Sequence, residues 1–188
     1  MELLFEYSKE NIELLQAEDL ILQKNALMEK LEEQLLLLGK GKAKSNIKLS
    51  AISPPLKVSK GEKHEGLPFL VLDYPRIFGQ EDIFAIRYLV WWGKQISISL
   101  LLKGSFLKEA LPKINEAIHK GRLQGFYIET EGSPWQNDLS ETYKNPLKPI
   151  ASEVDFLKIS NKISISELNH LGSFYNSSFD KLLQLVKF

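Results

Sequence analysis

Hydrophobic positions follow two different periods along this chain, and the period changes near residue 47. Between residues 8 and 38, apolar side chains recur every three or four residues, which is typical of an amphipathic helix. From residue 47 onward, short segments alternate apolar and polar side chains, which is typical of strands. The pattern therefore predicts a long N-terminal helix followed by a sheet domain.

The predicted N-terminal helix begins after Ser8, a residue suited to cap a helix, and ends at Gly39. A break near Gln16–Asp19, which would give two helices, is an alternative. The helix either covers a face of the sheet or is shared with a second subunit, because a seven-residue repeat suits a seam between two helices. The repeat comprises Leu14, Ala17, Ile21, Met28, Leu31, Leu35 and Leu38, with Lys24 as its one polar member.

The domain organisation follows from these periods: a helical segment over residues 1–38, a linker over 39–46, and a sheet domain over 47–188. The linker is predicted because residues 39–46 are rich in glycine and lysine. Short connections between strands favour an α+β fold with a mainly antiparallel sheet of about five to seven strands. Candidate strands are 47–52, 56–60, 67–74, 83–92, 95–103, 125–130 and 153–159, and candidate helices are 105–120 and 164–187, the latter in two pieces around Gly172.

The central strands read as a hairpin joined by a tight turn at Gly93. A two-residue turn with glycine first fits this position. It pairs Trp92 with Gln95 and Arg87 with Leu100. Because side chains alternate between the two faces of a strand, this register fixes which residues lie together.

In this register, one face of the hairpin is apolar except for Arg87. The other face combines the rings of Tyr88 and Trp92 with the hydroxyls of Ser97 and Ser99. Aromatic rings beside small polar groups can form the floor of a cleft for a small organic ligand. They can equally form a sheet face that is half covered by the N-terminal helix.

Arg87 is unusual because an unpaired charge on an apolar face costs several kcal/mol. Asp73, near the end of the largely apolar strand 67–74, is the best internal partner. Three interpretations stay open: a structural Arg87–Asp73 ion pair, an anion or carboxylate site, or an exposed arginine. In the second, Arg76 lies near the rim and Tyr74 supplies a polar group from the turn-rich connector that follows.

Composition narrows the class of protein. The chain has 24 basic and 24 acidic side chains and a net charge of zero, which argues against a nucleic-acid binder and gives no reason to expect a membrane partner. The absence of cysteine excludes disulfides, thiol catalysis and cysteine-bound zinc. No secretion signal and no transmembrane run is apparent, so a cytoplasmic location is expected.

Catalytic and cofactor motifs are absent, and no cofactor is expected. Glu129 and Glu131 point to the same face of their strand. Together with Asp73 they could hold Mg²⁺, as in a nuclease or phosphatase, although exposed acids at a strand end explain the same pattern. Among the histidines, His64 is a weak candidate for general-base work.

These observations predict a soluble cytoplasmic protein that binds a small anionic molecule or another protein. The predicted ligand site comprises Asp73, Tyr74, Arg76, Arg87, Tyr88, Trp92, Ser97 and Ser99. One alternative is a metal-dependent enzyme acting on a phosphate or carboxylate substrate. Another is a structural partner protein that forms a homodimer through the N-terminal helix.

Overall fold

The computed structural model describes residues 8–139 and 148–186, which form an α+β fold around one antiparallel sheet. Six strands lie in the order β1-β2-β3-β4-β6-β5, and each is antiparallel to its neighbours. The predicted fold class is therefore confirmed. The strands are β1 (Lys57–His64), β2 (Leu67–Phe78), β3 (Ile83–Trp91), β4 (Gln95–Lys103), β5 (Tyr127–Glu129) and β6 (Phe156–Ile163).

The helices lie at the two ends of the chain and between β4 and β5. They are α1 (Lys9–Leu15), α2 (Glu18–Ser45), α3 (Ile47–Ile52), α4 (Ser105–His119), the 3-10 helix η2 (Ile165–His170) and α5 (Leu171–Leu183). The segment 47–52, predicted as a strand, is helix α3, which buries only Leu49. In the part of the chain that the structure describes, no helix has the length and apolar character needed to span a bilayer.

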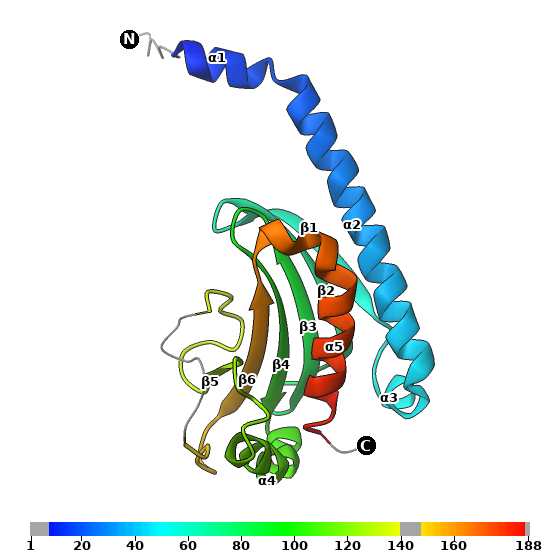
Figure 1. Cartoon of the computed structure of the whole chain (residues 1–188), viewed down its shortest axis with the longest axis vertical. Coiled ribbons are helices and arrows are strands. Elements are labelled where there is room, and N and C mark those ends of the chain that lie inside the picture. Colours follow the sequence, from blue (N-terminus) through cyan, green and yellow to red (C-terminus); the bar gives the residue numbers. More distant parts are fainter. Residues whose placement is uncertain (1–7, 140–147, 187–188) are drawn as a thin grey trace.

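One face of the sheet carries the main hydrophobic core. Helix α5 lies across this face, and α4 lies at one end of the sheet (Figure 1). Tyr175 and Phe179 of α5 pack beside Tyr88 of β3, with the rings of Tyr88 and Tyr175 edge to face at 5.2 Å. The C-terminal helical region thus divides into two pieces, as predicted, with the division before Leu171.

The second half of α2 is anchored to the sheet. Leu31 and Leu35 are fully buried, and Lys60 of β1 forms an ion pair with Glu32 at 2.7 Å. The helix does not end at Gly39 but continues to Ser45, so the predicted linker over 39–46 is helical almost throughout. Gly39 instead permits close packing, because a Cβ atom there would lie 3.2 Å from the side chain of Leu72.

The first part of the N-terminal region projects away from the domain (Figure 1). Ser8 caps α1 through a reciprocal capping box with Asn11, and the helix ends at Leu15. The two-helix alternative is therefore correct, with the break at residues 16 and 17. Helix α1 buries no residue.

The hairpin between β3 and β4 has a three-residue loop, residues 92–94, and the predicted two-residue turn is wrong. Gly93 occupies the left-handed region with φ of 67°, which glycine adopts without strain. The extra loop residue shifts the register by one, so Arg87 pairs with Ser99 and not with Leu100. A shift of one residue moves the side chains of one strand to the opposite face.

Candidate functional site

Arg87 and Asp73 form a bidentate ion pair across neighbouring strands. Nε of Arg87 donates to Oδ1 of Asp73 at 2.8 Å, and Nη2 donates to Oδ2 at 2.9 Å. The register makes this contact direct, because the two residues are cross-strand partners in β2 and β3. The Asp73 side chain is buried and that of Arg87 is 20% exposed. The planar guanidinium matches the carboxylate geometry, so the charge of Arg87 is already compensated.

Two aromatic rings lie against the same guanidinium. Its central carbon lies 4.8 Å from the ring centroid of Trp135 and 5.9 Å from that of Phe78. The two rings contact each other edge to face at 5.5 Å. Ring faces attract a cation, so both rings add to the contacts that hold the guanidinium beside Asp73.

A second buried ion pair, which the sequence analysis missed, lies on the same face. Nζ of Lys158 in β6 is 2.8 Å from Oε2 of Glu129 in β5, and both side chains are almost fully buried. Burial lowers the pKa of Lys158, the hydrogen bond and the charge of Glu129 oppose this, and the nearby positive charge of Arg87 lowers it further. The signal available in the sequence was a single lysine inside the apolar run of residues 156–159.

Two serines connect these ion pairs across the sheet. Ser99 of β4 pairs with Arg87 on one side and with Ser160 of β6 on the other. The two serine hydroxyls are hydrogen bonded at 2.8 Å, and both residues are buried. The face of the sheet opposite the main core therefore carries a row of polar side chains that runs from Asp73 through Arg87 and Ser99 to Ser160.

A covering loop, residues 130–139, lies over this polar row. Three backbone carbonyls of the loop accept hydrogen bonds from side chains of the sheet. Lys158 donates to the carbonyl of Gln136, Gln95 donates to that of Asn137 at 2.8 Å, and Lys162 donates to that of Leu139 at 3.2 Å. Residues 140–147, which follow the covering loop, lie outside the described residues.

The covering loop also reaches His64, the weak general-base candidate. The side chain of Asn137 lies 3.1 Å from Nε2 of His64, whose ring lies 4.5 Å from that of Trp91. These contacts give His64 a structural role in holding the loop against the sheet.

The predicted ligand-site residues are divided between the two faces of the sheet. Asp73, Arg87, Ser97 and Ser99 share the face beneath the covering loop, whereas Tyr88 lies in the main core. The expected cleft floor that combines tyrosine and tryptophan rings with serine hydroxyls is therefore wrong. The cause is the one-residue register shift in the hairpin.

The remaining predicted residues lie apart from Arg87. The hydroxyl of Tyr74 is hydrogen bonded to Ser50 at 2.7 Å, next to α3. Nε of Arg76 donates to the carbonyl of Pro55 at 2.6 Å, so its side chain contacts the segment before β1. Trp92 packs against the main core and is partly buried. The structure thus brings together only half of the predicted set.

The carboxylates proposed as metal ligands do not converge. Asp73 is held by Arg87 and Glu129 by Lys158, whereas Glu131 is exposed. Within residues 8–139 and 148–186, no group of three or more histidine, aspartate or glutamate side chains is placed to hold a metal ion.

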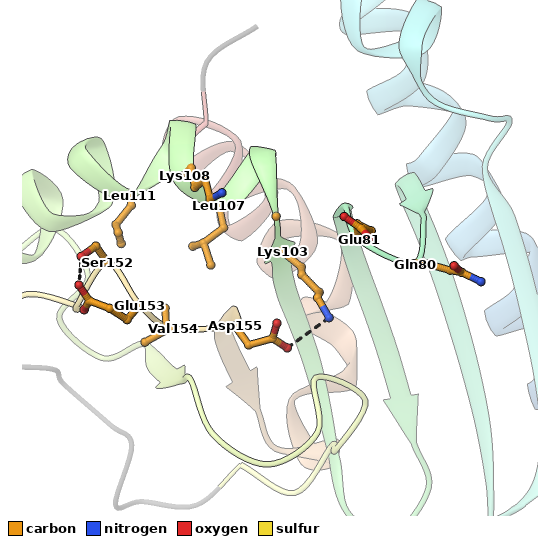
Figure 2. Close-up of a pocket in the computed structure, with 11 residues that line it drawn as sticks. Gln80, Glu81, Lys103, Leu107, Lys108, Leu111, Ser152, Glu153, Val154 and Asp155 are labelled. Carbon is orange, nitrogen blue, oxygen red and sulfur yellow. Dashed lines mark hydrogen bonds and ion pairs between the residues drawn. The ribbon is translucent and has the colours of Figure 1, made fainter.

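An open groove lies elsewhere, between α4, the end of β4 and the segment before β6 (Figure 2). Its volume is about 560 Å³, and it contains none of the predicted ligand-site residues. Lys103 points across it toward Asp155, and the two form an ion pair at 3.2 Å. The charged side chains along it have both signs, which gives the groove no preference for anions.

The N-terminal arm, residues 9–27, exposes the largest set of apolar side chains in the described chain. Leu15 is 83% exposed, Leu14 is 65% exposed, and no residue of the arm is classed as buried. The arm carries seven large exposed apolar residues: Ile12, Leu14, Leu15, Leu20, Ile21, Leu22 and Leu27.

Comparisons with protein-family models, curated proteins and solved structures gave no match to this chain. The features of this chain that bear on its function are therefore the two ion pairs, the groove and the arm.

Proposed function

We propose that this protein is an interaction module that binds another protein through its N-terminal arm. The observation that carries the proposal is the exposure of seven large apolar side chains on one projecting helical segment. Large exposed apolar patches on soluble domains mark sites of contact with a partner.

The architecture of the arm supports a role in binding. Helix α1 has seven residues and buries none of them, and an isolated helix of that length is marginal in water. A partner surface that covers the apolar side chains would stabilise the helical form. Amphipathic helices bind proteins by placing apolar residues spaced three or four apart into a groove or against another helix.

The other predicted functions have weaker support. Two N–H groups of Arg87 already donate to Asp73, and the ring of Trp135 lies 4.8 Å from the guanidinium carbon, so the charge of Arg87 has partners within the fold. The carboxylates proposed for an enzyme are engaged in two separate ion pairs. Within the arm, Lys24 forms an ion pair with Glu62 of β1 at 2.8 Å, whereas the seven large apolar side chains stay exposed.

Photo-crosslinking in the source cells tests this proposal. A photoreactive phenylalanine analogue replaces Leu15 or Leu22 in the full chain, and the matched control carries it at Glu109, an exposed residue of α4. We expect discrete adducts of higher mass from the two arm positions only. An arm that yields no adduct, or the same adducts as Glu109, would overturn the proposed function.

A further inference from the structure

Helix α2 carries opposite charges at its two ends. Glu18 and Asp19 begin the helix, whereas Lys40 and Lys44 lie in its last turns. None of these four has an ion-pair partner among residues 8–139 and 148–186. The helix therefore presents an acidic end on the arm and a basic end beside the domain.

Apolar residues accompany both charged ends on the outer side of α2, the side opposite Leu31 and Leu35. At 100° per residue, Leu22 and Leu37 lie on this outer side, and they are 56% and 63% exposed. Just beyond the basic end, α3 exposes Ile47. Each end thus combines uncovered leucine or isoleucine with unpaired charge, and the charges of the two ends have opposite sign.

We infer that the partner of the arm is a second copy of this chain, and that two α2 helices pack antiparallel along their outer sides. This inference rests on the proposed function, since it identifies the protein that the arm binds. Leu22 of one copy packs against Leu37 of the other, and Asp19 lies beside Lys40 of the second copy. Both contacts are centred between Glu29 and Lys30, so a single register forms them.

The charge pattern selects this orientation. In a parallel arrangement, Asp19 would approach Asp19 of the second copy, and Lys40 would approach Lys40 of the second copy. Like charges in contact disfavour association, whereas opposite charges steer it and fix its register. The antiparallel arrangement also repeats each contact twice, as a two-fold symmetric interface requires.

Disulfide trapping tests the relative orientation of the two α2 helices. Because the chain contains no cysteine, each single-cysteine variant has only the introduced thiol. The variants Leu22→Cys and Leu37→Cys are purified separately and then oxidised alone or as a mixture. We expect a covalent dimer at high yield only in the mixture, since the antiparallel register places residue 22 beside residue 37. Efficient cross-linking of Leu22→Cys alone would show a parallel arrangement and overturn the inference.

Sedimentation velocity of the full chain tests whether Leu22 lies in the interface. We expect the unmodified chain and Ile52→Asp to form dimers, and Leu22→Asp to be monomeric. Ile52 of α3 is 50% exposed and belongs neither to the arm nor to the outer side of α2, so it is the apolar control for Leu22. Circular dichroism checks that each variant keeps its fold. Dissociation by Ile52→Asp together with a stable Leu22→Asp dimer would show that the outer side of α2 is not the interface.

Charge reversal gives a third readout. Asp19→Lys raises the dissociation constant of the dimer by roughly 2- to 30-fold, because the symmetric dimer loses two exposed ion pairs. Adding Lys40→Asp to the same chain restores the original value. If Lys40→Asp instead raises the dissociation constant further, Asp19 and Lys40 do not pair across the interface.

The two proposals fail in different ways. A chain that is monomeric at all concentrations, yet gives arm-specific photo-adducts with a different protein, keeps the proposed function and overturns the self-association. A monomer whose arm gives no specific adduct overturns both. A dimer trapped through residues 22 and 37 supports both.

Discussion

Arg87 and Asp73 lie directly opposite each other on neighbouring strands and share two parallel hydrogen bonds of 2.8 and 2.9 Å. Arg87 is the single charge of β3 and Asp73 is the single acidic residue of β2, and each compensates the other. The ion pair is therefore a structural part of the sheet. The effect of removing it can be measured as a change in the free energy of unfolding.

The first prediction concerns loss of the arginine. Arg87→Met leaves the buried Asp73 carboxylate without its cation and lowers the free energy of unfolding by about 3 kcal/mol. The double variant Arg87→Met with Asp73→Leu recovers most of this loss, because neither charge then remains. Urea denaturation measures both. A single variant as stable as the unmodified chain would contradict the structural role of the pair.

The second prediction contrasts a buried with an exposed ion pair. Lys158→Met leaves Glu129 buried and uncompensated, and we expect a loss of about 3 kcal/mol in the free energy of unfolding. Lys103→Met breaks the exposed pair with Asp155 and costs less than about 1 kcal/mol. Unfolding of the two variants in guanidinium chloride at neutral pH measures both losses. Equal losses in the free energy of unfolding would contradict the expectation that the buried ion pair contributes more than the exposed one.

The third prediction concerns alkaline pH. Burial raises the pKa of Tyr88 and of Tyr175 above the ordinary value of 10.0. As the pH rises past that value, these tyrosines ionise in the unfolded chain but stay protonated in the folded chain. The folded state then binds more protons, so the free energy of unfolding falls as the pH rises.

Phenylalanine variants test this pH dependence. Neither hydroxyl has a hydrogen-bond partner among the described residues, so Tyr88→Phe with Tyr175→Phe is close to neutral at pH 7. We expect the double variant to lose less stability than the unmodified chain between about pH 9 and about pH 11. Thermal unfolding across this range is the measurement, and identical pH profiles would count against the prediction.

The fourth prediction compares two glycines of α2. Gly41→Ala raises the free energy of unfolding by about 0.5 to 1 kcal/mol, because alanine favours the helix and a Cβ atom there meets nothing within 4 Å. Gly39→Ala gains less or destabilises, because its Cβ atom would lie 3.2 Å from Leu72. Chemical denaturation of the two single variants decides the matter. An equal gain at both positions would disprove close packing at Gly39.

The period of the hydrophobic pattern was sufficient for the fold class and the position of most strands, and it made Asp73 the best internal candidate among three open interpretations of Arg87. It could not decide the length of the hairpin loop, since Gly93 fits both a two-residue and a three-residue connection. That single ambiguity moved Ser97 and Ser99 to the opposite face and separated them from Tyr88. A local choice in the turn thus determined which residues could form a site.

Two other features depended on tertiary contacts. Gly39 and the lysines around it resemble a linker, yet packing against Leu72 keeps this segment helical. The Lys158–Glu129 pair joins β6 to β5, a short strand whose pairing follows from contacts distant in the sequence. Local propensity is a weak guide where tertiary packing supplies most of the stabilisation.

The covering loop is held mainly through its own main chain, since the acceptors at positions 136, 137 and 139 are carbonyl oxygens. Every amino acid supplies a backbone carbonyl, so these three hydrogen bonds do not depend on which side chains the loop carries. Random substitution could therefore alter the outward surface of the loop extensively while its attachment persists. The donors Gln95, Lys158 and Lys162 have no such freedom, and a mutational scan should find that tolerance to change differs sharply between the loop and the sheet beneath it.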